Sequence, residues 1–94
     1  MPRAIVIDDS RAMRILLGDA MRALGYTVAE AEQGRMALDR LQADGPCEVA
    51  LVDWNMPVMN GLEFIRAVRA QPDWQAMRIL VITSETEVEQ VMLA

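Results

Sequence analysis

The chain has 94 residues and a net charge of −5, and 53% of its residues are hydrophobic while only 4% are aromatic. This length allows a single domain, residues 1–94, and the apolar content excludes a disordered segment. The negative charge argues against nucleic acid as a direct partner, and no apolar run approaches the ~20 residues of a membrane span. The single Cys47 cannot form an intrachain disulfide, so we expect a reducing, cytoplasmic location.

Four short apolar runs predict β-strands. Residues 4–7, 49–52 and 79–82 are rich in β-branched side chains and do not alternate with polar residues, which is typical of strands buried on both faces. The more mixed run at 26–29 predicts an edge strand.

Helical patterns separate these runs. The first stops at Gly25, the second covers residues 34–43, the third runs from Asn60 to just before Pro72, and the fourth opens with a capping-box pattern at 84–87. The side chains expected to face inward from the first three helices are Met13, Leu17, Ala20, Met21 and Leu24, then Ala37, Leu38 and Leu41, then Leu62, Ile65 and Val68. The order βαβαβαβα predicts an α/β fold, in which helices cover both faces of a doubly wound parallel sheet.

Acidic side chains follow two of the predicted strands. Asp8 and Asp9 come directly after the first strand, and Asp53 follows the third. Ligands of such sheets bind beyond the carboxyl ends of the strands, so we expect the three carboxylates to converge there. At separations of ~4–6 Å each pair repels by roughly 1–4 kcal/mol, and a cation offsets that repulsion. Because the chain has no histidine and the candidate ligands are oxygen atoms, the sequence predicts a Mg²⁺ site.

Each motif also has an ordinary structural interpretation. An Asp-Asp-Ser sequence before a helix is a common N-cap cluster. The segment 55–61 is usual turn chemistry, and residues 83–84 can simply join a strand to a capped helix. None of these interpretations predicts that all three features lie at the same edge of the sheet, and this coincidence favours a functional site.

Three segments have a recognisable sequence. They are Ile-Val-Ile-Asp-Asp-Ser-Arg-Ala-Met-Arg at 5–14, Val-Asp-Trp-Asn-Met-Pro-Val-Met-Asn-Gly-Leu-Glu at 52–63 and Ile-Thr-Ser-Glu at 82–85. These segments resemble the CheY-like receiver domains of bacterial response regulators, and the resemblance extends from Arg3 to the last residue. It implies two-component signal transduction, with a sensor histidine kinase or a phosphotransfer protein as partner.

The resemblance also implies a role for each site residue. Asp53 is similar to the phosphoacceptor, and Asp9 to the direct ligand of the Mg²⁺ cofactor. Asp8 is similar to the residue that holds the waters of the metal, and the backbone carbonyl of Asn55 would complete the metal site. Such a domain is not a conventional enzyme, because it catalyses only its own phosphorylation and dephosphorylation.

Further positions resemble those that respond to the phosphoryl group. Thr83 is similar to the switch hydroxyl that hydrogen-bonds a phosphoryl oxygen, and the small Ser84 leaves room for that movement. Asn55 and Glu85 correspond to positions that tune the access of the hydrolytic water. Their polarity implies a short-lived signal.

The family has a flavodoxin-like strand order of 2-1-3-4-5, with a lysine at the end of strand five. This chain contains no lysine and ends before that strand, so we expect the order 2-1-3-4 and a C-terminally incomplete domain that lacks roughly 30 residues. We expect Mg²⁺ to bind, but phosphorylation to be weak or uncoupled from switching. The uncovered edge at 79–82 implies one of three states: a fragment of a longer chain, a strand donated by a partner, or a homodimer through the strand-four/helix-four edge.

Two other functions fit the sequence less well. A receiver-like scaffold that dimerises without switching would not need an intact acidic site. An aspartyl-phosphate phosphohydrolase would carry the motif Asp-x-Asp after its first strand, whereas the first strand here ends in Asp8-Asp9.

Overall fold

The computed structural model describes residues 2–54, 56 and 58–82. The predictions for Asn55, Thr83, Ser84 and Glu85, and for the fourth helix, lie outside the described residues.

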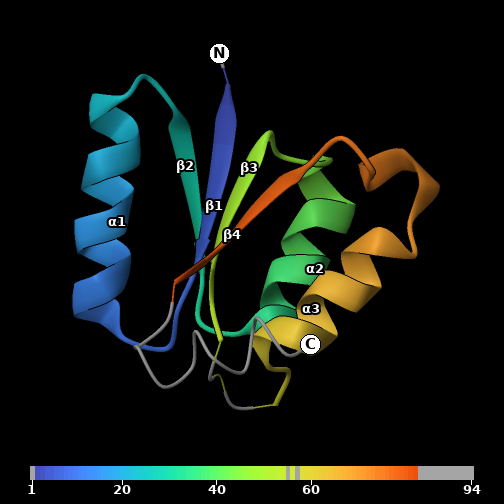
Figure 1. Cartoon of the computed structure of the whole chain (residues 1–94). Helices are drawn as coiled ribbons and strands as arrows, with labels where there is room; N and C mark the ends of the chain where they lie inside the picture. The colour runs from blue at the N-terminus through green and yellow to red at the C-terminus, as the bar shows by residue number, and fades with distance from the viewer. Residues whose placement is uncertain (1, 55, 57, 83–94) are drawn as a thin grey trace.

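Four parallel strands form one sheet in the order β2-β1-β3-β4 (Figure 1). The strands are β1 (Arg3–Ile7), β2 (Thr27–Ala31), β3 (Val49–Asp53) and β4 (Arg78–Ile82). The predicted doubly wound sheet and its order 2-1-3-4 are confirmed, and β2 is an edge strand that lies slightly later in the sequence than the predicted 26–29.

Three helices cover the two faces of this sheet (Figure 1). On one face lies α1 (Arg11–Ala23), and on the other lie α2 (Gly34–Asp44) and α3 (Gly61–Arg69). A 3-10 turn, η1 (Pro72–Trp74), follows α3 and buries Trp74. None of the described helices is long and apolar enough to cross a membrane.

The core has two parts because strand side chains alternate between the faces of the sheet. Ile5 and Ile7 of β1 pack beneath α2 and α3, whereas Ala4 and Val6 pack toward α1. All four side chains are fully buried, as predicted for a strand covered on both faces.

β4 differs from the prediction that it is buried on both faces. Leu80, which is paired in register with Leu51 on β3, is 53% exposed. It lies on the α1 side of the sheet because Ile79, one residue earlier, packs on the α2 side. Within the described part of the chain, no helix covers Leu80.

The helices face the sheet with partly different residues from those predicted. In α2 the three predicted residues are buried. In α1 the predicted Ala20 is exposed, as is Leu24 at the C-cap, because that helix packs on the sheet through Gly18 and Met21. In α3 the predicted Leu62 and Ile65 are only partly buried. The helix contacts the sheet through Gly61, Phe64 and Val68. Of these three residues, the sequence pattern predicted only Val68.

Candidate functional site

The turn between β1 and α1 holds two of the three predicted carboxylates. The Ser10 side chain caps α1 by accepting a hydrogen bond from the Met13 backbone N–H at 3.3 Å. Two residues before Ser10, the Asp8 Oδ1 atom accepts a hydrogen bond from the Ser10 backbone N–H at 2.8 Å. The Asp8 backbone N–H in turn donates to the Ala31 carbonyl at 3.1 Å, which joins the turn to the end of β2.

Asp53 is the last residue of β3, and the start of α3 packs tightly behind it. The Gly61 backbone N–H donates to the Trp54 carbonyl at 3.0 Å. A Cβ atom on Gly61 would lie 2.9 Å from the Asp53 carbonyl oxygen and 3.0 Å from the Trp54 Cα atom. Glycine at this position therefore allows α3 to approach the backbone that carries Asp53.

The cap of α3 fixes the same approach. Asn60 Oδ1 accepts from the Glu63 backbone N–H at 2.9 Å, and the Glu63 side chain accepts from the Asn60 backbone N–H at 3.2 Å. This capping box fixes Gly61 as the first residue of α3.

The folded chain brings Asp8, Asp9 and Asp53 together. One carboxylate oxygen from each residue lies within 4.8 Å of the other two. Asp8 is buried, Asp53 is partly buried and Asp9 is exposed, so the cluster is anchored in the protein and open on one side. Three oxygen ligands with an open side fit Mg²⁺, which keeps water and phosphate oxygens among its ligands.

The electrostatics of Asp8 reflect this crowding. Burial raises the pKa of the Asp8 carboxyl above its ordinary value, and the neighbouring Asp9 carboxylate raises it further, while the Ser10 backbone N–H and Arg14 oppose the rise. A buried carboxylate next to another carboxylate favours a proton or a cation. The site is therefore electrostatically suited to a divalent metal ion.

Arg14 is a site residue that sequence reasoning missed. Its Nη1 atom donates a 2.7 Å hydrogen bond to the Asp8 carbonyl oxygen, and its Nε atom lies 3.4 Å from Glu30 Oε1 on β2. The available signal was an arginine four residues after the helix cap, on the side of α1 that also carries Gly18 and Met21. That signal is weak, because solvated arginines are common on helices.

Comparisons with known proteins give the family. The family model of the response regulator receiver domain matches residues 4–94. The chemotaxis protein CheY1 of Helicobacter pylori is 39% identical over 93 residues, which cover 98% of this chain and 75% of that protein. The CheY homolog of Campylobacter jejuni is also 39% identical, over 98% of this chain and 72% of that protein.

Solved structures agree. The chemotaxis response regulator CheY4 of Vibrio cholerae superposes with a TM-score of 0.88 at 37% identity, over 98% of this chain and 76% of that one. A response regulator receiver protein from Pseudomonas putida gives a TM-score of 0.84 at 26% identity, over 97% and 74% of the two chains. These matches favour a signalling receiver over the scaffold alternative, and over a conventional enzyme. The chain belongs to the response regulator receiver family, whose members act in two-component signal transduction.

Proposed function

We propose that this chain, as a single receiver domain, accepts a phosphoryl group on Asp53 in a Mg²⁺-dependent reaction. The observation that carries the proposal is the convergence of Asp8, Asp9 and Asp53 within 4.8 Å in a chain of this family. A carboxylate oxygen of Asp53 would attack the phosphorus of a phosphohistidine or of a small phosphodonor. The bond to the leaving group would break, and the leaving group would keep the electron pair.

The other proposed site residues act on charge and position. Phosphoryl transfer depends mainly on alignment and on neutralising the equatorial oxygens, which is what a bound Mg²⁺ supplies. Asp9 and Asp53 would hold the metal ion directly, and Asp8 would bind its waters. From the family resemblance we also assign the Asn55 carbonyl to the metal, Thr83 to the switch, and Asn55, Ser84 and Glu85 to the surroundings of the phosphoryl group.

Incubation with acetyl phosphate and Mg²⁺ tests the phosphoacceptor. We expect one added phosphoryl group by intact mass spectrometry in the wild type and none in Asp53→Asn. Asp73→Asn is the matched control, because Asp73 is an exposed aspartate in η1. Full incorporation of the phosphoryl group into Asp53→Asn would contradict the assignment of Asp53 as the phosphoacceptor.

Tryptophan fluorescence tests the metal site separately. Trp54 directly follows Asp53, whereas Trp74 is buried beside α3. In a Trp74→Phe background, which isolates Trp54, we expect a saturable response to Mg²⁺ that is lost in Asp9→Asn. An unchanged response in that variant would contradict the ligand assignment.

We further propose that the phosphodonor is a sensor histidine kinase or a phosphotransfer protein in the cytoplasm. The named relatives are chemotaxis proteins, which supports a chemotaxis-type pathway. Transfer of ³²P from a phosphorylated histidine phosphotransfer domain to the chain, abolished by Asp53→Asn, is the expected result.

Self-association through β4 is a further proposal about partners. Exposed Leu80 and partly buried Ile82 lie on the same face of β4, at one edge of the described sheet, and such edges promote strand pairing. Light scattering after size exclusion should give a dimer. Leu80→Lys should disrupt this dimer, whereas Leu24→Lys, at the exposed C-cap of α1, should not. A monomeric wild type at high concentration would exclude the dimer.

A further inference from the structure

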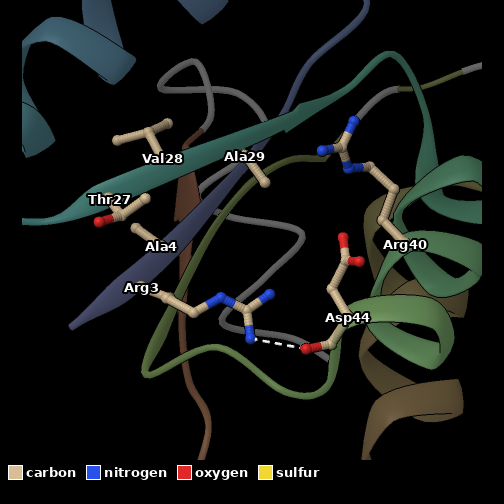
Figure 2. A pocket seen from close by; sticks show the side chains of 7 residues that line it. All are labelled: Arg3, Ala4, Thr27, Val28, Ala29, Arg40 and Asp44. Carbon is tan, nitrogen blue, oxygen red and sulfur yellow. Dashed lines mark hydrogen bonds between the residues drawn. The ribbon is translucent and has the colours of Figure 1, made fainter. Parts of the chain in front are cut away.

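A groove lies at the opposite end of the sheet from the three carboxylates (Figure 2). Its volume is about 440 Å³, and it lies between the beginnings of β1 and β2 and the second half of α2. Because the strands are parallel, Arg3 and Thr27, which are paired in register, begin their strands at this end, while Asp53 ends β3 at the other. The groove is therefore separate from the proposed phosphoryl site.

The floor of the groove is the sheet surface at the beginning of β1 and β2. Its apolar side chain is the partly buried Ala29, which packs on the α2 side, and it continues over the strands at Ala4 and Val28, whose side chains pack toward α1. The exposed side chain of Thr27, which carries a hydroxyl group, lies where β2 begins. A ligand with a short hydrocarbon part can cover this floor and remove it from water.

The outer edge of β2 adds backbone polar groups. The Thr27 N–H donates to Pro2 at 2.8 Å, and the Ala31 carbonyl accepts from Asp8 at 3.1 Å, so these two residues direct their backbone groups toward β1 and its flanks. In a parallel ladder the intervening residues alternate, and the N–H and C=O of Val28 therefore point away from β1. They offer one donor and one acceptor beside the groove.

Two arginines give the groove its positive charge. Arg3 is held in place, because its Nη1 atom donates to the carbonyl oxygens of Asp44 at 2.9 Å and Pro46 at 3.4 Å. Arg40 projects from α2 and makes no hydrogen bond or ion pair with the described residues. In Figure 2 the Arg3 side chain extends toward Asp44, whereas the Arg40 guanidinium group points away from Arg3, on the side of the groove where Ala29 lies.

The buried Cys47 thiol is influenced by the charged groups of the groove. Burial raises the pKa of Cys47, and Arg3 and Arg40 both oppose the rise, whereas Glu48 and Asp44 add to it. Two guanidinium groups and two carboxylates therefore act on this thiol. Two guanidinium groups outweigh the single Asp44 carboxylate among the side chains that line it.

We propose that this groove binds a small organic anion, whose acidic group is held by Arg40 and Arg3 and whose hydrocarbon part lies on the floor. Guanidinium groups recognise carboxylate and phosphoryl oxygens through paired, charge-assisted hydrogen bonds. Arg3 is already ordered by its two carbonyl contacts, so less side-chain freedom is lost on binding. Asp44 repels the acidic group and accepts a hydrogen bond from any hydroxyl or amine that the ligand carries.

Amide chemical-shift titration of the ¹⁵N-labelled chain tests this site. The probes are succinate and, separately, inorganic phosphate, both without Mg²⁺ and at constant ionic strength. We expect saturable shifts at residues 3–4, 27–29 and 40–45, and stronger binding of succinate identifies a carboxylate with a hydrocarbon part as the ligand chemistry.

Charge variants of opposite sign sharpen the test. Arg40→Gln should weaken succinate binding and Asp44→Asn should strengthen it, each roughly three- to tenfold, as expected for one charge at ~6 Å near solvent. Arg66→Gln is the matched control, because Arg66 is an exposed arginine of α3 that does not line the groove. All three positions are exposed, so unchanged spectra elsewhere will show that the variants fold.

Three results would overturn the proposal. They are the absence of saturable shifts with both probes, equal binding by the Arg40→Gln and Arg66→Gln variants, and shifts confined to the segments around Asp8 and Asp53. The phosphorylation and Mg²⁺ assays do not involve the groove, so failure here leaves the proposed function untouched.

Discussion

The guanidinium group of Arg14 donates a 2.7 Å hydrogen bond to the backbone carbonyl oxygen of Asp8. The same side chain is 12% exposed and pairs with Glu30 of β2. This mostly buried cation therefore adds a side-chain connection between the Asp8 turn and β2 to the backbone hydrogen bond between Asp8 and Ala31.

Replacement of Arg14 tests this connection. Arg14→Met leaves the Asp8 carbonyl and the Glu30 carboxylate without this partner, and we expect a loss of about 1–3 kcal/mol in the free energy of unfolding, measured with urea. Arg22→Met is the control, because Arg22 also contacts Glu30 but its side chain is 49% exposed, and we expect a loss below about 1 kcal/mol. Equal losses in the two variants would show that the burial of Arg14 adds nothing to the free energy of unfolding.

A Mg²⁺ titration of the same variant separates charge from position. Removal of a positive charge near the carboxylates would by itself tighten Mg²⁺ binding. We expect weaker Mg²⁺ binding in Arg14→Met, because the Asp8 turn loses its side-chain connection to Glu30 of β2. Tighter binding would mean that Arg14 acts only through its charge.

Asp8 should make the metal-free chain less stable as the pH rises. The pKa of its carboxyl is raised in the folded state, chiefly by burial, so the folded state holds the proton more tightly than the unfolded state, and stability falls as the pH rises through this raised pKa. Asp8→Asn should therefore stabilise the metal-free chain at neutral pH by about 1 kcal/mol, and its side-chain oxygen can still accept from the Ser10 N–H.

The pH profile checks the cause. The advantage of Asp8→Asn in thermal unfolding should shrink as the pH falls toward the range where Asp8 is protonated. Exposed Asp73→Asn should show no such trend. An advantage that does not change with pH would contradict an electrostatic origin.

Val58 adopts a backbone conformation that its side chain disfavours. Its φ is 67°, in the left-handed region, and the residue is 81% exposed. β-Branched residues are rarely found there, whereas asparagine is tolerated. Val58→Asn should raise the free energy of unfolding by about 1 kcal/mol, and Val58→Ala, which keeps a Cβ atom, should raise it less. No gain from Val58→Asn would show that the valine is not strained.

Two glycines should respond to alanine in opposite directions. At Gly61 a Cβ would clash with backbone atoms of Asp53 and Trp54, so Gly61→Ala should cost about 1–3 kcal/mol and alter the Trp54 fluorescence. At Gly18, inside α1, the nearest atom is the flexible end of Arg22 at 3.2 Å, and alanine should stabilise the helix by up to about 1 kcal/mol. Equal and mild effects would contradict the tight packing behind Asp53.

The order of elements and the meeting of Asp8, Asp9 and Asp53 could be predicted because both follow from local patterns and one rule of parallel sheets. The apolar runs end where the carboxylates begin, and no further information is required. The inward face of α3 could not be predicted in this way, because Leu62, Phe64 and Ile65 are all apolar and only the packing against the sheet selects Phe64.

Other features depend on contacts between distant segments. Arg14 and Glu30 are 16 positions apart in the chain, and nothing local marks them as a pair. The exposure of Leu80 likewise depends on what covers β4, which its own apolar sequence does not reveal.

Strand β1 connects the two proposed sites. Its first residue, Arg3, borders the groove, and Asp8 directly follows its last residue. Five residues of strand extend ~16 Å, about twice the ~8 Å over which physiological salt screens a charge. A fully paired strand is also too stiff to shorten or bend on binding. The binding free energies of an anion at Arg3 and a cation at Asp8 should therefore be additive, so that neither ligand changes the affinity for the other.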